Sequence, residues 1–173
     1  MAKATLVYII DPDTQEVLMA KRGAKKVGVG YWFGYGGKIE EGETPEDCAY
    51  RETLEESGGV IKLKKENLER VVLMQFFNKP ESNPHTDEPV FEVICFRIFQ
   101  KKSDVGSSIS TEEMVDPTWF PVKNIPWNEM KPGDELFVPH IISGTPVKGW
   151  LWFGPEGVKD SDINTCSTND LVI

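Results

Sequence analysis

Hydrophobic residues near the N-terminus form two short runs that a polar turn separates. Residues 5–10 are β-branched, aliphatic and aromatic, Asp11-Pro12-Asp13 is a turn signal, and residues 16–20 resume the apolar pattern. Runs of this kind, bounded by turn residues, are typical of paired strands. The pattern therefore predicts a β-hairpin, and the glycine- and aromatic-rich residues 23–37 after it predict a loop that leads into a short strand.

Signals for the start and the end of a helix frame residues 45–57. Thr44 can act as N-cap, Pro45 suits the first helical position, and Asp47 is a short-armed variant of the capping-box acid. The glycine pair that follows Ser57 suits a helix C-terminus. We therefore expect a helix of about three turns here.

The rest of the chain alternates strand-like and helix-like segments. Asp134 is the expected N-cap of a helix that runs to residue 142. The tail from Val158 is weakly patterned, and we expect a late strand or a poorly ordered segment. No linker is long enough to separate domains, so residues 1–173 are expected to form one domain. The expected strands are 70–77, 90–99, 118–122 and 146–153, with a polar, proline-rich linker at 78–89.

Composition places the chain among ordinary globular proteins. It has 173 residues, of which 39% are hydrophobic and 27% charged, and this excludes collagen-like and wholly disordered classes. No apolar run approaches the ~18 residues of a membrane span, and no signal-peptide core follows Met1. We expect a cytoplasmic protein, although nuclear or mitochondrial pools stay open. Three cysteines without CxxC spacing suggest neither disulfides nor a zinc site: Cys48, Cys95 and Cys166.

Negative charge is concentrated in one segment. The formal net charge is −9, yet residues 39–58 alone carry eight acidic residues against the single basic Arg51. A binder of duplex DNA needs a basic surface stripe, so this distribution argues against that class. The concentrated carboxylates themselves require a counter-ion.

Three of these carboxylates fall on one stripe of the expected helix. At ~100° per residue, Glu52, Glu55 and Glu56 share an arc of about 100°, opposite a packing stripe that includes Thr53 and Leu54. Like charges at this spacing repel, and the C-terminal end of a helix disfavours anions. Carboxylates without nearby His or Cys suit magnesium or manganese. The alternative is a solvated acidic helix face.

The order of residues narrows this choice. The sequence resembles the Nudix box, G-x5-E-x7-R-E-U-x-E-E-x-G-U, where U is a bulky aliphatic residue, over residues 37–59. Thr53 and Gly59 depart from the two aliphatic positions, and Leu54 and Val60 are expected to supply the apolar contacts. All seven fixed positions match: Gly37, Glu43, Arg51, Glu52, Glu55, Glu56 and Gly58.

Collinear short segments outside the box are similar to the MutT-type oxidised purine nucleoside triphosphatases of eukaryotes. They include residues 30–32, 112–114, 119–120, 131–135 and 148–150. The resemblance implies an α/β class fold, an α/β/α sandwich with a mixed sheet. It also implies Mg²⁺-dependent hydrolysis of nucleoside triphosphates, including oxidised purine nucleotides such as 8-oxo-dGTP, to the monophosphate and pyrophosphate, with Mn²⁺ as a possible substitute.

The resemblance further implies that the partner is a small-molecule nucleotide and that the protein binds neither duplex nucleic acid nor a membrane. It also implies a monomer. Two other functions stay open: hydrolysis of another nucleoside diphosphate derivative, such as a dinucleoside polyphosphate or a nucleotide sugar, and a catalytically silent nucleotide-binding module. The intact glutamates favour an enzyme, because a retired site would be free to lose mutually repelling charges.

Site residues follow from the same resemblance, position by position. The expected metal ligands are Gly37, Glu52, Glu55, Glu56 and Glu113. The expected catalytic residues are Glu56, Glu52, Arg51 and Glu113, with Glu43 in a supporting position. The expected substrate contacts are Phe33, Lys38, Asp134 and Lys21, the last from the basic cluster at residues 21–26.

The positions that recognise the base in this family differ here. Phe33 stands in place of an asparagine, Lys131 in place of a stacking tryptophan, and Gly133-Asp134 in place of two aspartates. Only Asp134 is retained, and as an N-cap it would also have a structural reason to be aspartate. Phe33, Phe76 or Trp127 could stack on a base instead. The resemblance therefore implies the reaction type but leaves the preferred base open.

Overall fold

The computed structural model describes residues 1–26, 28–79, 81–107 and 109–173. Val27 of the expected glycine loop, Pro80 of the expected linker, and Ser108 lie outside the described residues. Within the described ranges, no helix is both long and apolar enough to cross a membrane.

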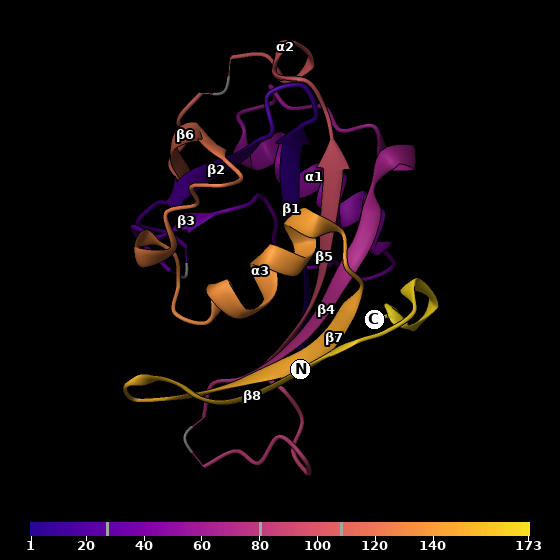
Figure 1. Cartoon of the computed structure of the whole chain (residues 1–173), viewed down its shortest axis with the longest axis vertical. Helices are drawn as coiled ribbons and strands as arrows, with labels where there is room; N and C mark the ends of the chain where they lie inside the picture. Colours follow the sequence, from indigo (N-terminus) through magenta and orange to yellow (C-terminus); the bar gives the residue numbers. More distant parts are fainter. Residues whose placement is uncertain (27, 80, 108) are drawn as a thin grey trace.

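A mixed β-sheet organises the fold (Figure 1). The predicted hairpin is confirmed as the antiparallel pair β1 (Ala2–Asp11) and β2 (Glu16–Arg22). β1 also pairs in parallel with β5, so the hairpin lies in the sheet interior. The strand order is β3-β2-β1-β5-β4-β7-β8, with β6 beside β2. The other strands are β3 (Trp32–Phe33), β4 (Glu69–Phe77), β5 (Phe91–Phe99), β6 (Met114–Pro121), β7 (Val147–Gly154) and β8 (Gly157–Thr165).

Two helices cover opposite faces of this sheet. Because alternate strand residues point to opposite faces, Tyr8 of β1 packs in the core that contains Phe137 of α3 (Asp134–Ser143). Its neighbour Val7 packs in the core that contains Ala49 of α1 (Pro45–Glu56). Figure 1 shows α3 in front of the sheet and α1 behind it. The α/β/α sandwich is therefore confirmed. Shorter helical segments are α2 (Lys102–Val105), η1 (Lys65–Asn67), η2 (Trp127–Glu129) and η3 (Thr168–Asp170).

Helix α1 begins and ends as its sequence predicts, but its packing differs. The Thr44 hydroxyl accepts a hydrogen bond from the Asp47 backbone N–H at 3.1 Å, and Ser57 is the C-cap. Thr53, not Leu54, fills the buried position: it is fully buried and its hydroxyl donates to the Ala49 carbonyl at 2.7 Å. The intrahelical bond satisfies the hydroxyl, so threonine can replace a bulky aliphatic residue here.

The expected N-cap role of Asp134 is wrong. Gly133 is the N-cap, and α3 begins at Asp134, whose side chain makes no cap bond. Glu135 instead accepts from the Gly133 N–H at 2.8 Å. Gly133 has φ of 100°, and a Cβ there would lie 2.9 Å from Val158 and 3.0 Å from Leu151. This tight left-handed turn requires glycine. The Asp134 carboxyl that follows it is buried and does not cap the helix.

The later strands also extend beyond their sequence signals. β6 starts at Met114, ahead of the expected residue 118, where it pairs with the end of β2. The weakly patterned tail forms β8, which pairs with β7 in an antiparallel hairpin. Its exposed polar residues reflect an edge position that contributes little to the core, and such strands carry a weak sequence pattern.

Candidate active site

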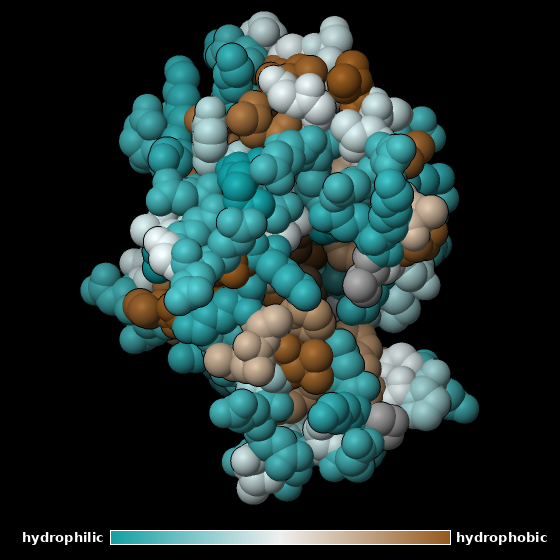
Figure 2. All heavy atoms as spheres, turned by 180° about the vertical axis from the view of Figure 1, so that it is seen from behind, coloured by the Kyte–Doolittle hydropathy of each residue, from teal (hydrophilic) through white to brown (hydrophobic). Residues whose placement is uncertain are grey.

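A cavity of about 450 Å³ connects the Nudix-like segment to the aromatic side chains of the sheet. In the view from behind Figure 1, hydrophilic residues dominate the surface and surround a hollow with hydrophobic residues at its depth (Figure 2). The aromatic lining residues of the cavity are Phe33, Phe76, Phe91 and Phe137. Its charged lining residues are Arg22, Lys26, Lys38, Glu52, Lys131 and Asp134.

Glu52 lies directly against the backbone of Gly37. A Cβ on Gly37 would overlap the Glu52 carboxylate, so only glycine permits this close approach. Gly36 is constrained in the same way, because a Cβ there would overlap the Thr5 carbonyl oxygen of β1. The paired glycines therefore bring a backbone turn and a helix carboxylate together at the cavity wall.

Arg51 joins the acidic residues around Glu52. Its Nε and Nη2 donate to the two carboxylate oxygens of Glu43 at 2.8 and 2.9 Å, and its Nη1 donates to Glu52 Oε1 at 2.8 Å. Nη2 also donates to the Lys38 carbonyl oxygen at 3.1 Å. The guanidinium holds the pKa of Glu43 down at about 2. Arg51 and Glu43 thus fix the position of the Glu52 carboxylate.

Glu56 is buried, which rules out for this residue the alternative of a solvated acidic helix face. It is 2% exposed. Oε2 accepts from the Gly36 N–H at 2.9 Å, while Oε1 pairs with Arg22 at 2.7 Å and Lys26 at 3.1 Å. Burial raises the pKa of Glu56, and Arg22 opposes that rise. The required counter-ion is thus supplied, in this structure, by the basic cluster ahead of the glycine loop.

Glu55 and Glu113 are more exposed. The Glu55 side chain is 61% exposed and approaches Arg51 at 3.5 Å. Glu113 Oε2 lies 2.6 Å from Lys26 Nζ, so one ammonium bridges Glu113 and Glu56. Across residues 1–26, 28–79, 81–107 and 109–173, no group of three or more His, Cys, Asp or Glu side chains already converges on a metal position.

The basic cluster divides between the cavity and other surfaces. Arg22 and Lys26 line the cavity, whereas Lys21, the residue expected to contact substrate, does not. Lys21 Nζ lies 5.0 Å from the centroid of the Trp32 ring. Neighbouring residues of a strand point to opposite faces, and Lys21 and Arg22 are neighbours on β2. Strand alternation was the sequence signal that could have selected Arg22.

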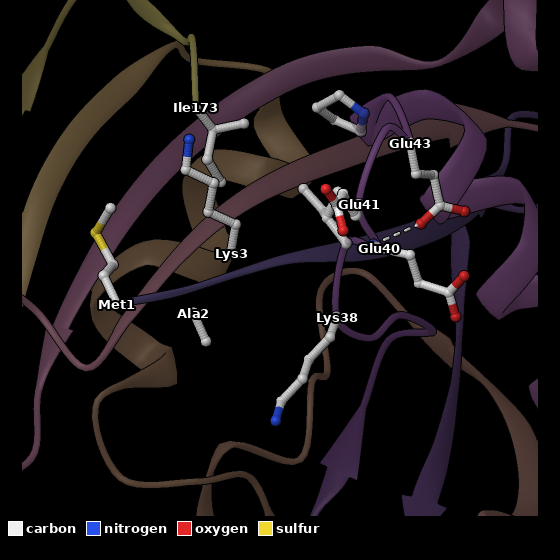
Figure 3. A pocket seen from close by; sticks show the side chains of 10 residues that line it. Met1, Ala2, Lys3, Lys38, Glu40, Glu41, Glu43 and Ile173 are labelled. Atoms are coloured by element: carbon white, nitrogen blue, oxygen red, sulfur yellow. Dashed lines mark hydrogen bonds between the residues drawn. The ribbon is translucent and has the colours of Figure 1, made fainter.

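Lys38 lines the cavity and also a second hollow of about 440 Å³ on the surface. Figure 3 shows this second pocket, with Lys38 and Lys3 on one side and Glu40, Glu41 and Glu43 on the other. Glu43 also accepts from the Glu40 N–H there at 3.0 Å. The backbone of Lys38 therefore supports Arg51, and its side chain carries positive charge at the boundary of both hollows.

The inner part of the lining is aromatic, with one aspartate and one lysine. The Arg22 guanidinium lies 4.9 Å from the centroid of the Phe33 ring, and Phe76 meets Phe137 edge-on at 5.9 Å. Asp134 is 4% exposed, and burial raises its pKa to about 7. Of the three aromatic residues expected as possible stacking faces for a base, Phe33 and Phe76 line the cavity and Trp127 does not.

Comparisons with known proteins agree with this geometry. The NUDIX domain family matches residues 1–141. A mouse protein named oxidized purine nucleoside triphosphate hydrolase is 35% identical over 151 residues, which cover 86% of this chain and 85% of the mouse protein. A zebrafish protein of the same name is 32% identical over 149 residues, with the same coverage of both chains.

A solved structure supports the fold. The MutT protein from Bacillus halodurans has a TM-score of 0.74 and 20% identity, covering 95% of this chain and 98% of its own. The family match, the two relatives and the position of Glu52 of the box at the cavity wall lead to the same assignment. The chain therefore belongs to the NUDIX domain family.

Proposed function

We propose that this protein is a Mg²⁺-dependent pyrophosphohydrolase that converts nucleoside triphosphates, oxidised purine nucleotides among them, to the monophosphate and pyrophosphate. The observation that carries the proposal is a single cavity that joins Glu52 and the Gly36-Gly37 backbone to a pocket containing Phe33 and Asp134. Such a cavity offers carboxylates to the phosphates' metal ions and aromatic faces to a base. The names of the mouse and zebrafish relatives agree with it.

The donor set fits a hard divalent cation. Oxygen ligands, without histidine or thiolate, are those that Mg²⁺ and Mn²⁺ prefer. The bound ions would neutralise phosphate oxygens and lower the pKa of water. We assign as ligands Glu52, Glu55, Glu56 and Glu113 with the Gly37 carbonyl.

The side chains around these glutamates have separate tasks in this proposal. Arg51 holds Glu52 in place through direct contact, and the Gly36 N–H holds Glu56. One of the two carboxylates, Glu56 or Glu52, accepts the proton of the attacking water. Burial strengthens Glu56 as a base by raising its pKa. Arg22, Lys26 and Lys38 face the cavity with positive charge suited to a triphosphate.

A substrate panel with pyrophosphate readout tests the proposal against its alternatives. It contains nucleoside triphosphates, dinucleoside polyphosphates and nucleotide sugars, each with and without Mg²⁺. We expect pyrophosphate release from the triphosphates. Turnover of only dinucleoside polyphosphates or nucleotide sugars would indicate a hydrolase of another nucleoside diphosphate derivative. Nucleotide binding without turnover would indicate a catalytically silent binding module.

Magnesium is expected to raise the melting temperature. Ions that bind only the folded protein stabilise it, and at ten times the dissociation constant the rise should be about 3–5 °C for a chain of this size. The rise should shrink in Glu55→Gln and Glu56→Gln but not in Glu66→Gln, an exposed residue of η1. Melting curves at millimolar Mg²⁺ that coincide with metal-free curves would count against the site.

Discrimination between oxidised and unmodified purines is expected to be weak. Phe33 stacks on any base, whereas the large discrimination of base-reading sites comes from buried hydrogen bonds. Values of kcat/KM for 8-oxo-dGTP, dGTP and dATP should show detectable hydrolysis of 8-oxo-dGTP with a preference over dGTP of about tenfold or less. A preference of about a thousandfold would show that another residue replaces the missing asparagine.

A further inference from the structure

A lysine and an aspartate three positions apart share the wall of the cavity. Lys131 and Asp134 both line it, and the Asp134 N–H donates to the Lys131 carbonyl oxygen at 3.0 Å. Between them, Gly133 adopts the left-handed conformation against Val158 and Leu151. The backbone therefore fixes the spacing between one cationic and one anionic side chain.

Asp134 carries unused hydrogen-bonding capacity. It is 4% exposed, and its Oδ2 has no hydrogen-bond partner among the residues that the structure describes. A buried carboxylate oxygen without a partner is costly, and such atoms are rare in folded proteins. Because Glu135 takes the Gly133 N–H, helix capping does not explain this aspartate. A ligand in the cavity would satisfy the free oxygen.

Lys131 brings a matching donor to the same wall. Its Nζ lies 4.9 Å from the centroid of the Phe153 ring and 5.7 Å from that of Phe76. Burial lowers the pKa of Lys131, and Asp134 opposes that change. Over the described residues, neither side chain forms an ion pair. Both charged groups are therefore free to contact a ligand.

We propose that Lys131 and Asp134 together read the base edge and select lactam bases, those with a carbonyl oxygen beside a ring N–H. The ammonium donates to the carbonyl oxygen, and the carboxylate accepts from the ring N–H. Adenine and cytosine present an amino group and an unprotonated ring nitrogen, which is the reverse pattern. The inference rests on the proposed function and deepens it by naming the class of base, with Lys131 as the specificity-determining residue.

The pair also accounts for weak discrimination between 8-oxo-dGTP and dGTP. Both nucleotides present the same lactam edge at O6 and N1–H, so reading this edge does not separate them. The distinction it draws lies between guanine-type and adenine-type bases. Because burial raises the pKa of Asp134 to about 7, pH 8.0 keeps the carboxylate an acceptor for the test.

The nucleotides dITP and dATP differ only in the groups at this edge and form a matched pair of probes. At pH 8.0, kcat/KM for dITP should exceed that for dATP by at least ~10-fold, the scale of one good edge contact. Lys131→Met should reduce the ratio to within about threefold, chiefly by raising KM for dITP, while Lys131→Arg keeps part of it. Asp134→Asn should also lower the ratio, because an amide can present either a donor or an acceptor.

Lys159→Met is the matched control. Lys159 also lies over an aromatic ring, 3.6 Å from the centroid of Trp152, but it does not line the cavity. The ratio of kcat/KM for dITP to that for dATP in Lys159→Met should equal the wild-type ratio. A wild-type ratio near one, or a ratio that Lys131→Met leaves unchanged, would overturn the proposal.

Equilibrium binding separates this inference from the proposed hydrolysis. Calorimetric titration with dIMP and dAMP should show tighter binding of dIMP, and Lys131→Met should remove the difference. If the protein hydrolyses no triphosphate yet binds dIMP selectively, the proposed function fails and the base assignment holds. If it hydrolyses both probes but binds dIMP and dAMP equally, the base assignment fails alone.

Discussion

Replacing Glu56 by glutamine should lower turnover at least ~100-fold, and Glu52→Gln should have a similar effect. Loss of an acid-base or metal-positioning group has this scale. Glutamine keeps the size of the side chain but removes the charge. Glu56 pairs with Arg22 and Lys26 while Oε2 accepts from the Gly36 N–H, so the substitution turns one of the two oxygens that accept from these three donors into an NH2 group, which cannot accept.

Steady-state pyrophosphate release at saturating Mg²⁺ measures this effect. Glu66→Gln provides the control, because it removes one exposed carboxylate outside the cavity. Circular dichroism and melting curves of each variant exclude a loss of fold. Undiminished turnover in both Glu56→Gln and Glu52→Gln, or full activity in excess chelator, would contradict the metal-site assignment.

Arg51→Met should lower both turnover and stability. Arg51 makes two bonds to Glu43 and one to Glu52, and the carboxylate side chains are only 13% and 12% exposed. Leaving such groups unpaired costs about 2 kcal/mol, less than for a fully buried pair. We expect a decrease in melting temperature of about 4–8 °C and a loss of turnover of at least ~10-fold. Arg51→Lys should restore little, because an ammonium cannot reproduce the two-pronged contact.

Arg70→Met separates the two effects. Arg70 also holds a glutamate of α1 through two bonds, to Glu46 at 2.6 and 2.8 Å, but it does not line the cavity. That variant should lose stability and retain its turnover. If Arg51→Met likewise loses only stability, Arg51 has a purely structural role.

The sequence predicted the elements whose signals are local. The β1–β2 hairpin has a turn between two β-branched runs, and α1 has Thr44, Pro45 and Ser57 at its boundaries. These signals act within a few residues, so no tertiary information is needed to interpret them. The layer arrangement came from the family resemblance, which the comparisons support.

Features that depend on packing between distant segments could not be predicted in this way. Helix periodicity placed Glu56 on an acidic stripe opposite the packing stripe, but it could not show that Arg22 of β2 pairs with it. Asp134 follows Gly133, which packs so closely against Val158 of β8 that a Cβ would lie 2.9 Å from it. In each case the environment of the side chain includes a residue from a distant segment, which local sequence signals do not describe.

The most direct test of the central assignment is ³¹P NMR of the products formed from 8-oxo-dGTP. With Mg²⁺, the protein should produce the nucleoside monophosphate and pyrophosphate in equal amounts, and with excess chelator it should produce neither. Formation of the diphosphate with orthophosphate, full turnover in excess chelator, or no turnover of 8-oxo-dGTP would contradict the assignment.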